Sequence, residues 1–356
     1  VVGVAQDKDG ARADIETPDG SYSVKGDYLL ACDGAGSPVR QMIGLDFQGQ
    51  LFEERFLITD VEMKADFPSE RWFWFEPSFH PGQSALLHKQ PDNIYRIDLQ
   101  LGWDADPEEE KKPENVIPRI KKALCNREFE IDWVSVYTFQ CRRIDRFVHD
   151  RIIFVGDSAH VVSPFGARGG NGGTQDVDNL GWKLAAVIKG RADARLLESY
   201  NQERTHGADE NIKNSARATS FMSPKSDMEM MFRNEVLNLA GDMPFARKMI
   251  NSGRLSAPCS LAGFDLQTPS SVAPVEPGMA AVDAPLKSGG QSDWLLNRLG
   301  GEFVLASFGE PARCDVDGIR QLHVSSMCSR DPVNLSDVTG LAAKRYGEGL
   351  SYLFRP

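Results

Sequence analysis

Three features are scarce or missing in this sequence: long apolar runs, paired cysteines and an excess of basic residues. No apolar run approaches the roughly 18 residues of a membrane helix, so no membrane-spanning segment is expected. The six cysteines form no C-x-x-C pair, which argues against a zinc site or a redox dithiol. The net charge of −11 argues against a phosphate-tracking surface, so nucleic acid is not an expected partner.

The N-terminal sequence shows neither a signal peptide nor an initiating methionine. The first residue is Val1 rather than Met, and no charged segment with an apolar run behind it precedes the first strand-like alternation. We therefore expect the true N-terminus to lie upstream. Cysteines without regular spacing favour a reducing cytoplasm as the compartment.

The apolar pattern predicts several strands before residue 150. Alternation predicts an antiparallel meander of three strands, Val1 to Ala5, Ala11 to Thr17 and Ser21 to Lys25. The continuous apolar runs Tyr28 to Cys32 and Arg151 to Val155 suit buried parallel strands. Between them a strand-rich layer is expected, with a helix near Val116 to Leu124 and the strands Phe52 to Met63, Arg71 to Phe75, Ser84 to His88, Ile94 to Leu101 and Ile131 to Phe139.

The second half of the chain is predicted to be helical and then to form a small α/β module. Apolar residues spaced by three and four predict a helix over Thr174 to Lys189, with further helices over Ala194 to Thr219 and Asp227 to Ser252. A proline-rich stretch then indicates a linker. The strands Glu302 to Phe308 and Leu350 to Phe354 flank a helix near Leu341 to Arg345.

Two carboxylates stand directly after the two predicted parallel strands. Asp33 opens the segment Asp33-Gly34-Ala35-Gly36-Ser37-Pro38-Val39-Arg40, and Asp157 follows Gly156. The carboxyl ends of parallel strands are where sheets of this kind bind ligands. Taken alone, the first segment is equally consistent with an ordinary Asp-Gly turn and a solvated arginine.

A glycine-rich stretch after Asp157 is the more specific signal. It runs Ser163-Pro164-Phe165-Gly166-Ala167-Arg168-Gly169-Gly170-Asn171-Gly172-Gly173 and leads into the predicted helix. A glycine-rich loop before a helix leaves N–H donors free at the positive end of the helix dipole, which favours an anion or an electron-rich ring edge. The Asp157 carboxylate suits hydroxyl donors rather than a phosphate, because two anions repel.

These segments resemble the two FAD motifs of class A flavoprotein aromatic hydroxylases, the family of para-hydroxybenzoate, phenol and 3-hydroxyphenylpropionate hydroxylases. The resemblance implies an α/β fold with a doubly wound, Rossmann-like FAD-binding domain, an inserted β-sheet substrate domain and a thioredoxin-like C-terminal module without redox cysteines. One departure is clear: the family's opening G-x-G-x-x-G loop is absent. We therefore expect the FAD-binding domain to lack its first βαβ unit, which would have bound adenosine diphosphate.

The chain length exceeds what a single hydrophobic core supports, so several domains are expected. The FAD-binding domain would consist of residues 1–46 and 149–262, and the substrate-binding sheet of residues 47–148. A linker would cover 263–292 and the thioredoxin-like module 293–356. The module suggests a possible homodimer.

The resemblance also implies roles for individual residues. Asp157 would bind the ribityl hydroxyls, and Pro164 and Gly166 would provide the flavin-ring environment in which catalysis occurs, without a side-chain base. Asp33 and Arg40 would serve the pyrophosphate and nicotinamide-nucleotide region, directly or by ordering the loop. The full set of expected cofactor-binding residues is Asp33, Gly34, Arg40, Gly156, Asp157, Pro164, Gly166, Gly169, Gly170, Asn171 and Gly172.

Several other residues allow more than one interpretation. His160 is a residue type that often serves as a general base, yet a structural role in the second motif is favoured. Arg142 and Arg143 suit a substrate carboxylate, but a solvated charge cluster is favoured. Trp72 and Trp74 could form a substrate-pocket wall with His88, while core packing is the alternative for all three.

The implied reaction is hydroxylation of a small phenolic compound by FAD, NAD(P)H and molecular oxygen through a flavin hydroperoxide. The cofactor would supply the difficult chemistry, which is consistent with a sequence that shows no nucleophile or metal cluster. Two alternatives stay open. One is another FAD oxidoreductase on the same scaffold, such as a dehydrogenase, reductase or halogenase. The other is a non-catalytic, truncated product that cannot hold FAD.

Overall fold

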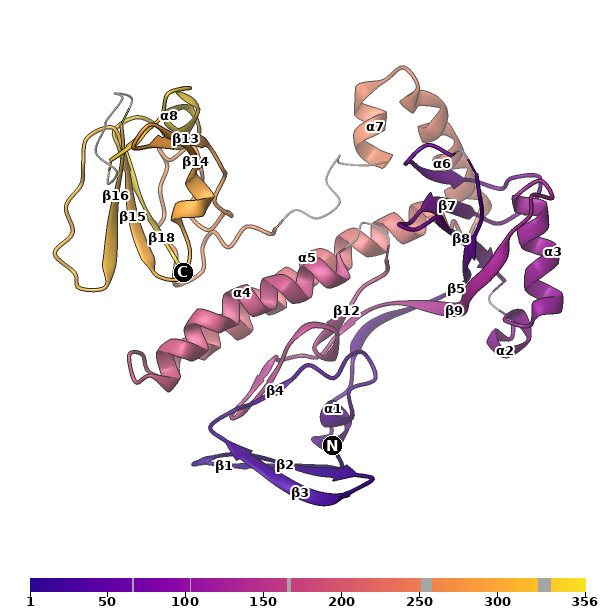
Figure 1. The fold of residues 1–356 in the computed structure, drawn as a ribbon, viewed down its shortest axis with the longest axis horizontal. Coiled ribbons are helices and arrows are strands. Elements are labelled where there is room, and N and C mark those ends of the chain that lie inside the picture. Colours follow the sequence, from indigo (N-terminus) through magenta and orange to yellow (C-terminus); the bar gives the residue numbers. More distant parts are fainter. Residues whose placement is uncertain (66, 103, 165–167, 251–257, 326–333) are drawn as a thin grey trace. The chain divides into compact units, whose positions relative to one another are not determined.

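The computed structural model describes residues 1–356 except 66, 103, 165–167, 251–257 and 326–333. Its elements group into two compact units, one of residues 1–174 and 208–256 and the other of residues 175–207 and 257–356. Figure 1 shows the order of the elements along the chain. In the part of the chain described, no helix is long and apolar enough to cross a membrane.

The chain begins with the predicted antiparallel meander. The strands β1 (Gly3–Asp7), β2 (Gly10–Thr17) and β3 (Gly20–Gly26) pair in that order. The predicted parallel pair is also confirmed, because β4 (Leu29–Ala31) pairs in parallel with β11 (Ile152–Phe154). Here β11 is completely buried, as its continuous apolar sequence requires.

A six-stranded sheet fills most of the interval between these parallel strands. Its order is β12-β9-β5-β8-β7-β6 (Figure 1), and the pairs described are antiparallel. Its strands are β5 (Gln48–Glu62), β6 (Arg71–Trp74), β7 (Ala85–Lys89), β8 (Ile94–Leu101), β9 (Glu130–Arg143) and β12 (His160–Val161). Because β12 comes from the second motif, the stretch after Asp157 is joined directly to this sheet.

The two faces of the six-stranded sheet carry different cores. One face packs with α3 (Pro113–Ala123), whose Val116 and Ile120 are fully buried among residues such as Leu57 and Ile97. The opposite face, which we call the aromatic face, carries Phe56, Leu86, Phe139, Cys141 and Val162, and the partly buried Ile58 and Phe73 pack against them. Side chains from the last turns of α5 (Leu196–Met222) also pack on this cluster: Ile212, Ala216, Ala218 and Met222. Strand alternation places neighbouring residues on these opposite faces.

The remaining elements of the first unit are mostly short. They are α1 (Pro38–Met42), α2 (Pro107–Glu110), β10 (Val148–His149), a 3-10 turn (Gly156–Ser158), α6 (Asp227–Ala240) and α7 (Pro244–Ile250). The helical prediction over Asp227 to Ser252 is met by two helices, since the chain turns at Gly241 and Asp242 before Pro244 opens α7, and Asn251 and Ser252 lie outside the described residues. Two long helices, α4 (Gly169–Ile188) and α5 (Leu196–Met222), run through both units.

The second unit ends in the expected small α/β module. Its sheet has the order β14-β13-β17-β16-β15-β18, with β15 parallel to β16 and antiparallel to β18. The elements are β13 (Pro285–Ser288), β14 (Gln291–Trp294), a 3-10 turn (Leu295–Arg298), β15 (Phe303–Phe308), β16 (Ile319–Ser325), β17 (Asn334–Ser336), α8 (Leu341–Tyr346) and β18 (Leu350–Phe354). Since β13 pairs with β17, this sheet already begins within the predicted 263–292 linker.

Candidate cofactor and substrate site

The two motif carboxylates lie at the same edge of one sheet. Asp33 follows β4 and Asp157 follows β11, and these strands are neighbours with parallel register from Leu29 with Ile152 to Ala31 with Phe154. Parallel pairing therefore brings the two loops together although more than a hundred residues separate them. Ser158 reinforces the junction, because its hydroxyl donates to the Ala31 carbonyl at 2.5 Å.

Arg40 connects the two motif loops. The Asp33 carboxylate accepts a hydrogen bond from the Val39 amide at 3.0 Å and so holds the start of α1. From α1 the buried Arg40 guanidinium donates to the Ser158 carbonyl at 3.0 Å and to the Ala35 carbonyl at 2.6 Å. Arg40 also stacks on Phe47, 3.8 Å from the ring centroid. Of the two predicted roles, these contacts favour ordering of the loops.

The glycine-rich stretch differs from the prediction at its C-terminal end. The predicted helix begins at Gly169 rather than at residue 174, so Gly169, Gly170, Asn171 and Gly172 form the first turn of α4 and are not loop residues. The Gly172 amide already donates to the Arg168 carbonyl at 2.8 Å. The N–H groups of Gly169 and Gly170 precede the first intrahelical bonds and point out of the helix start. Pro164 is exposed, and Gly166 lies outside the described residues.

Close packing explains Gly172, because a Cβ there would stand 3.1 Å from Cε1 of His160. A Cβ at Gly173 would stand 3.5 Å from the Gly156 Cα, which is an ordinary van der Waals distance. Gly156 itself has a φ of +66°, which a side chain would strain. His160 is buried and stacks on Phe147, so the favoured structural role agrees with its position.

The stretch after Asp157 continues onto the aromatic face of the six-stranded sheet. Val162 packs into the cluster on this face, and the Ser163 amide donates to the Cys141 sulfur at 3.4 Å. The Tyr137 hydroxyl lies near enough to Asp157 that the Asp157 charge, added to burial, raises the pKa of Tyr137. Through β12, the loop that carries the exposed Asp157 is thus joined directly to the sheet with the aromatic face.

The three predicted pocket residues do not lie together. Trp74 packs against the α3 core with Phe79, and Trp72 meets Trp74 edge to face at 5.7 Å. His88 pairs with Arg71, whose side chain is on the opposite face from Trp72. The predicted wall of Trp72, Trp74 and His88 is therefore wrong as a group, because strand alternation separates the tryptophans from the histidine.

Arg142 and Arg143 are engaged within the first unit. Arg143 binds the two Asp209 oxygens at 2.6 and 2.9 Å, and Arg142 donates to the Phe47 carbonyl at 3.0 Å. These contacts agree with the favoured structural interpretation. Asp60, Arg96 and Asp98 also lie on the aromatic face and were not predicted; the signal that could have found them was the spacing of charged residues in otherwise apolar strands.

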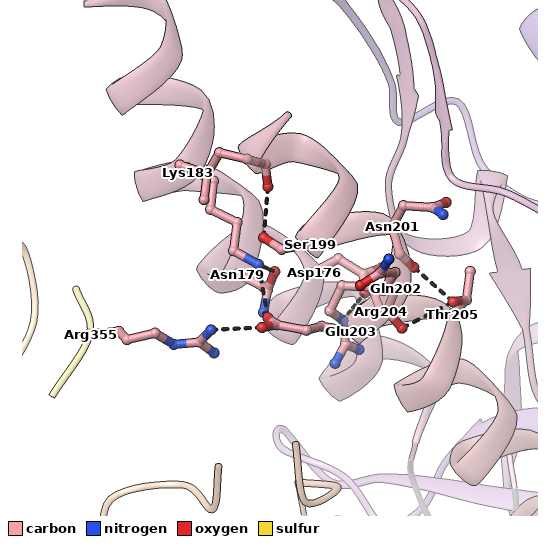
Figure 2. A network of polar contacts seen from close by, with 11 residues as sticks. Asp176, Asn179, Lys183, Ser199, Asn201, Gln202, Glu203, Arg204, Thr205 and Arg355 are labelled. Carbon is pink, nitrogen blue, oxygen red and sulfur yellow. Dashed lines mark hydrogen bonds and ion pairs between the residues drawn. The ribbon is translucent and has the colours of Figure 1, made fainter. Parts of the chain in front are cut away.

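Helix α4 is fixed further along by a buried polar network in the second unit (Figure 2). Lys183 lies 2.8 Å from Glu203 and donates to Asn179 at 2.7 Å, while Arg355 reaches the other Glu203 oxygen at 2.7 Å. The Lys183 and Glu203 side chains are 0% and 1% exposed. Burial lowers the pKa of Lys183 to about 8, although Glu203 opposes this shift.

For the Glu203 carboxylate, the neighbouring charges have a larger effect on the pKa than burial has. Burial raises its pKa, but the hydrogen bond from Arg355 and the charge of Lys183 outweigh burial and hold that pKa below its usual value. Figure 2 also shows the neighbouring Asp176 and Arg204, which pair at 2.6 Å and are almost completely buried. These contacts tie α4 to α5.

A family model described as "FAD binding domain" matches residues 1–215. The 3-(3-hydroxy-phenyl)propionate/3-hydroxycinnamic acid hydroxylase of Comamonas testosteroni is 31% identical over 243 residues, which are 67% of this chain and 40% of that protein. The protein of the same name from Escherichia coli O139:H28 is 30% identical over 67% of this chain and 43% of its own length. The chain thus spans about two fifths of these relatives.

Solved structures resemble the whole chain. The flavin-dependent monooxygenase PieE, determined with FAD and substrate, matches with a TM-score of 0.79 and 21% identity over 100% of this chain and 70% of its own. Aklavinone-11 hydroxylase, determined with FAD and aklavinone, matches with a TM-score of 0.73 and 19% identity over 99% and 68%. At these identities the likeness shows a shared α/β fold.

Proposed function

Because the chain belongs to the family defined by this FAD binding domain, we propose that it holds FAD beside β4 and β11 and hydroxylates a phenolic compound with NAD(P)H and molecular oxygen. The observation that carries the proposal is the convergence of the Asp33 loop, the Asp157 loop and the glycine-rich start of α4. Curated relatives named as hydroxylases of 3-hydroxyphenyl compounds support the substrate class.

The proposed cofactor contacts divide by chemistry. The exposed Asp157 carboxylate would accept hydrogen bonds from ribityl hydroxyls. The first turn of α4 would direct N–H groups and the helix dipole at the electron-rich edge of the flavin ring. Asp33, Gly34, Gly156 and Arg40 would shape the loops around the remainder of the cofactor. The ring environment would include Pro164, Gly166, Gly169, Gly170, Asn171 and Gly172.

FAD would supply the oxygen-transfer chemistry. The chain's own contribution would be to orient the aromatic substrate between the Pro164 stretch and the aromatic face, and to exclude water from that space. The exposed ring of Tyr137, 5.7 Å from that of the buried Phe139, offers an aromatic surface to a flat ligand. A phenolic ring is favoured because an electrophilic oxygen requires an electron-donating substituent.

The division of the chain into a substrate-binding sheet and a C-terminal module is part of the same proposal. Residues 47–148 would be the inserted substrate-binding sheet, which β12 extends. The last module would be thioredoxin-like, which its mixed sheet of parallel and antiparallel neighbours and its helix α8 support. We also propose that the protein forms a homodimer through this module, which light scattering can measure, and that it is cytoplasmic.

The visible absorbance spectrum of the purified protein tests the cofactor. The family's pyrophosphate loop is absent from these 356 residues, so the chain is compared with its gene product including whatever sequence precedes Val1. We expect a flavin band that Asp157→Asn removes and that Asp178→Asn, at an exposed position of α4, leaves unchanged. No flavin in either form would support the non-catalytic alternative.

Turnover tests the reaction. We expect phenols to accelerate NAD(P)H oxidation and to appear as hydroxylated products in a mass spectrum. A protein that binds flavin and oxidises NAD(P)H without hydroxylating any phenol would instead support the second oxidoreductase alternative.

A further inference from the structure

Strand pairing arranges the aromatic face into rows that run across the sheet. Antiparallel partners share a face, so Phe56 with Tyr137 and Gln100 forms one row. The next row contains Ile58, Asp98, Leu86 and Phe73. The third contains Asp60, Arg96, His88 and Arg71. Successive rows lie about 7 Å apart, which is two residues along a strand.

Asp98 is the one ionisable residue of the middle row. Its cross-strand neighbours are Ile58 and Leu86, both of which pack in the aromatic-face cluster. The Asp98 Oδ1 atom is buried and has no hydrogen-bond partner. A buried carboxylate oxygen without a partner is costly, and such groups in a folded protein call for an explanation.

The third row supplies no partner to this oxygen. Asp60 and Arg96 satisfy each other through two hydrogen bonds of 2.7 and 2.6 Å. His88, diagonal to Asp98, has a buried Nδ1 atom that also lacks a partner. Two unsatisfied polar atoms therefore lie close together on the same face of the sheet.

The first row leads back to the proposed flavin site. Phe56 stacks on Phe139, and the cluster that contains both also contains Val162, two residues before Pro164. Phe56 is buried, but Tyr137 of the same row is exposed, so an aromatic ring lying over Tyr137 would have one edge toward Pro164. A substituent on its other edge would point to the row of Asp98.

We propose that Asp98 recognises the hydroxyl group of the aromatic substrate by accepting its hydrogen bond at Oδ1, with His88 Nδ1 as a second polar contact at that end of the ligand. This inference rests on the proposed function and assigns the hydroxyl-binding point of its substrate site. It makes Asp98 the residue that distinguishes a phenol from the same ring without a free hydroxyl.

The electrostatics of Asp98 agree with a ligand-directed role. Burial raises the pKa of Asp98 to about 6, and Arg96 and Arg71 lower it only in part, while Asp60 adds to the rise. At pH 7.5 the group is therefore ionised at a cost to the folded state and can only accept hydrogen bonds. Residues that reduce stability in the absence of a ligand are typical of binding sites.

Calorimetric titration with phenol and with its methyl ether, anisole, tests the inference without relying on flavin. For Asp98→Asn we expect phenol affinity to fall by at least about tenfold, the loss expected for a charge-assisted hydrogen bond. Anisole affinity should stay unchanged, and the melting temperature at pH 7.5 should rise. Asp98→Glu, which displaces the carboxylate, should also lose phenol affinity.

Thr59→Val is the matched control. Its hydroxyl is likewise buried without a partner, but Thr59 pairs with Ile97 on the opposite face, so phenol binding should not change. Unaltered phenol affinity in Asp98→Asn, equal losses of phenol and anisole, or no phenol binding by the parent would each overturn the inference. Phenol binding that depends on Asp98, together with no flavin band in the chain or in its full gene product, would uphold it while refuting the proposed function.

Discussion

Removing the Glu203 carboxylate is the most revealing perturbation of the scaffold that supports α4. In Glu203→Gln the shape of the side chain is retained, but Lys183 and Arg355 both lose their carboxylate partner. Lys183 has no exposed surface through which water could replace the carboxylate. The substitution therefore leaves a buried cation whose other hydrogen-bond acceptor is the Asn179 amide.

The expected cost follows from this burial. Breaking a buried ion pair by neutralising one partner costs about 3–5 kcal/mol, because the other charge is left uncompensated. Lys183→Met should cost less, about 1–3 kcal/mol, since Glu203 keeps its hydrogen bonds to Arg355 and Asn179. The double variant should lose less than the sum of the two, because it removes the unpaired charge.

Urea unfolding followed by circular dichroism measures these free energies. Glu302→Gln is the control, because Glu302 forms a surface pair with Arg320 in the same unit and is half exposed. Its loss should cost about 0–1 kcal/mol. Two results would refute the view that this network excludes water and that its side chains stabilise one another. One is a Glu203→Gln variant that is no less stable than the control, and the other is strictly additive losses of stability in the double variant.

Two further predictions follow from local contacts. The folded-state pKa of Lys183, about 8, lies below its ordinary value of 10.5. Between these pH values the unfolded chain binds more protons than the folded protein, so the stability contributed by this group should rise with pH. A pH series of melting curves should show this rise in the parent but not in Lys183→Met. Gly170→Ala should raise stability by about 0.5–1 kcal/mol, because its Cβ meets nothing within 4 Å in a helix. Gly172→Ala should instead lower the stability by about 1–3 kcal/mol through the contact with His160. If chemical denaturation found Gly172→Ala more stable than Gly170→Ala, it would contradict the packing described at the start of α4.

Local sequence patterns were sufficient for much of the fold. Apolar alternation and turn residues located the first meander, and continuous apolar runs located β4 and β11. The carboxylates at their ends followed directly, because a buried parallel strand must end where polar residues begin. Patterns of this kind depend on neighbours in the chain and can be recognised without tertiary information.

The start of α4 could not be obtained in this way. Glycine has poor helix propensity, so the sequence indicates a loop through Gly173. In the structure the same glycines form a helical turn where backbone packs on Gly156 and His160. Tertiary contact therefore overrides local preference at this site.

The sequence by itself determined which residues alternate, where the buried strands end and which two segments resemble the FAD motifs of the family. Only the tertiary structure decided the faces and partners: Trp72 and Trp74 turn to the α3 core, while Asp98 and His88 share the aromatic face. Likewise, Lys183, Glu203 and Arg355 meet only after distant segments pack. The physical reason is that a strand's period fixes two alternating sets of side chains, whereas pairing register and packing between remote segments decide which set is buried against which neighbours.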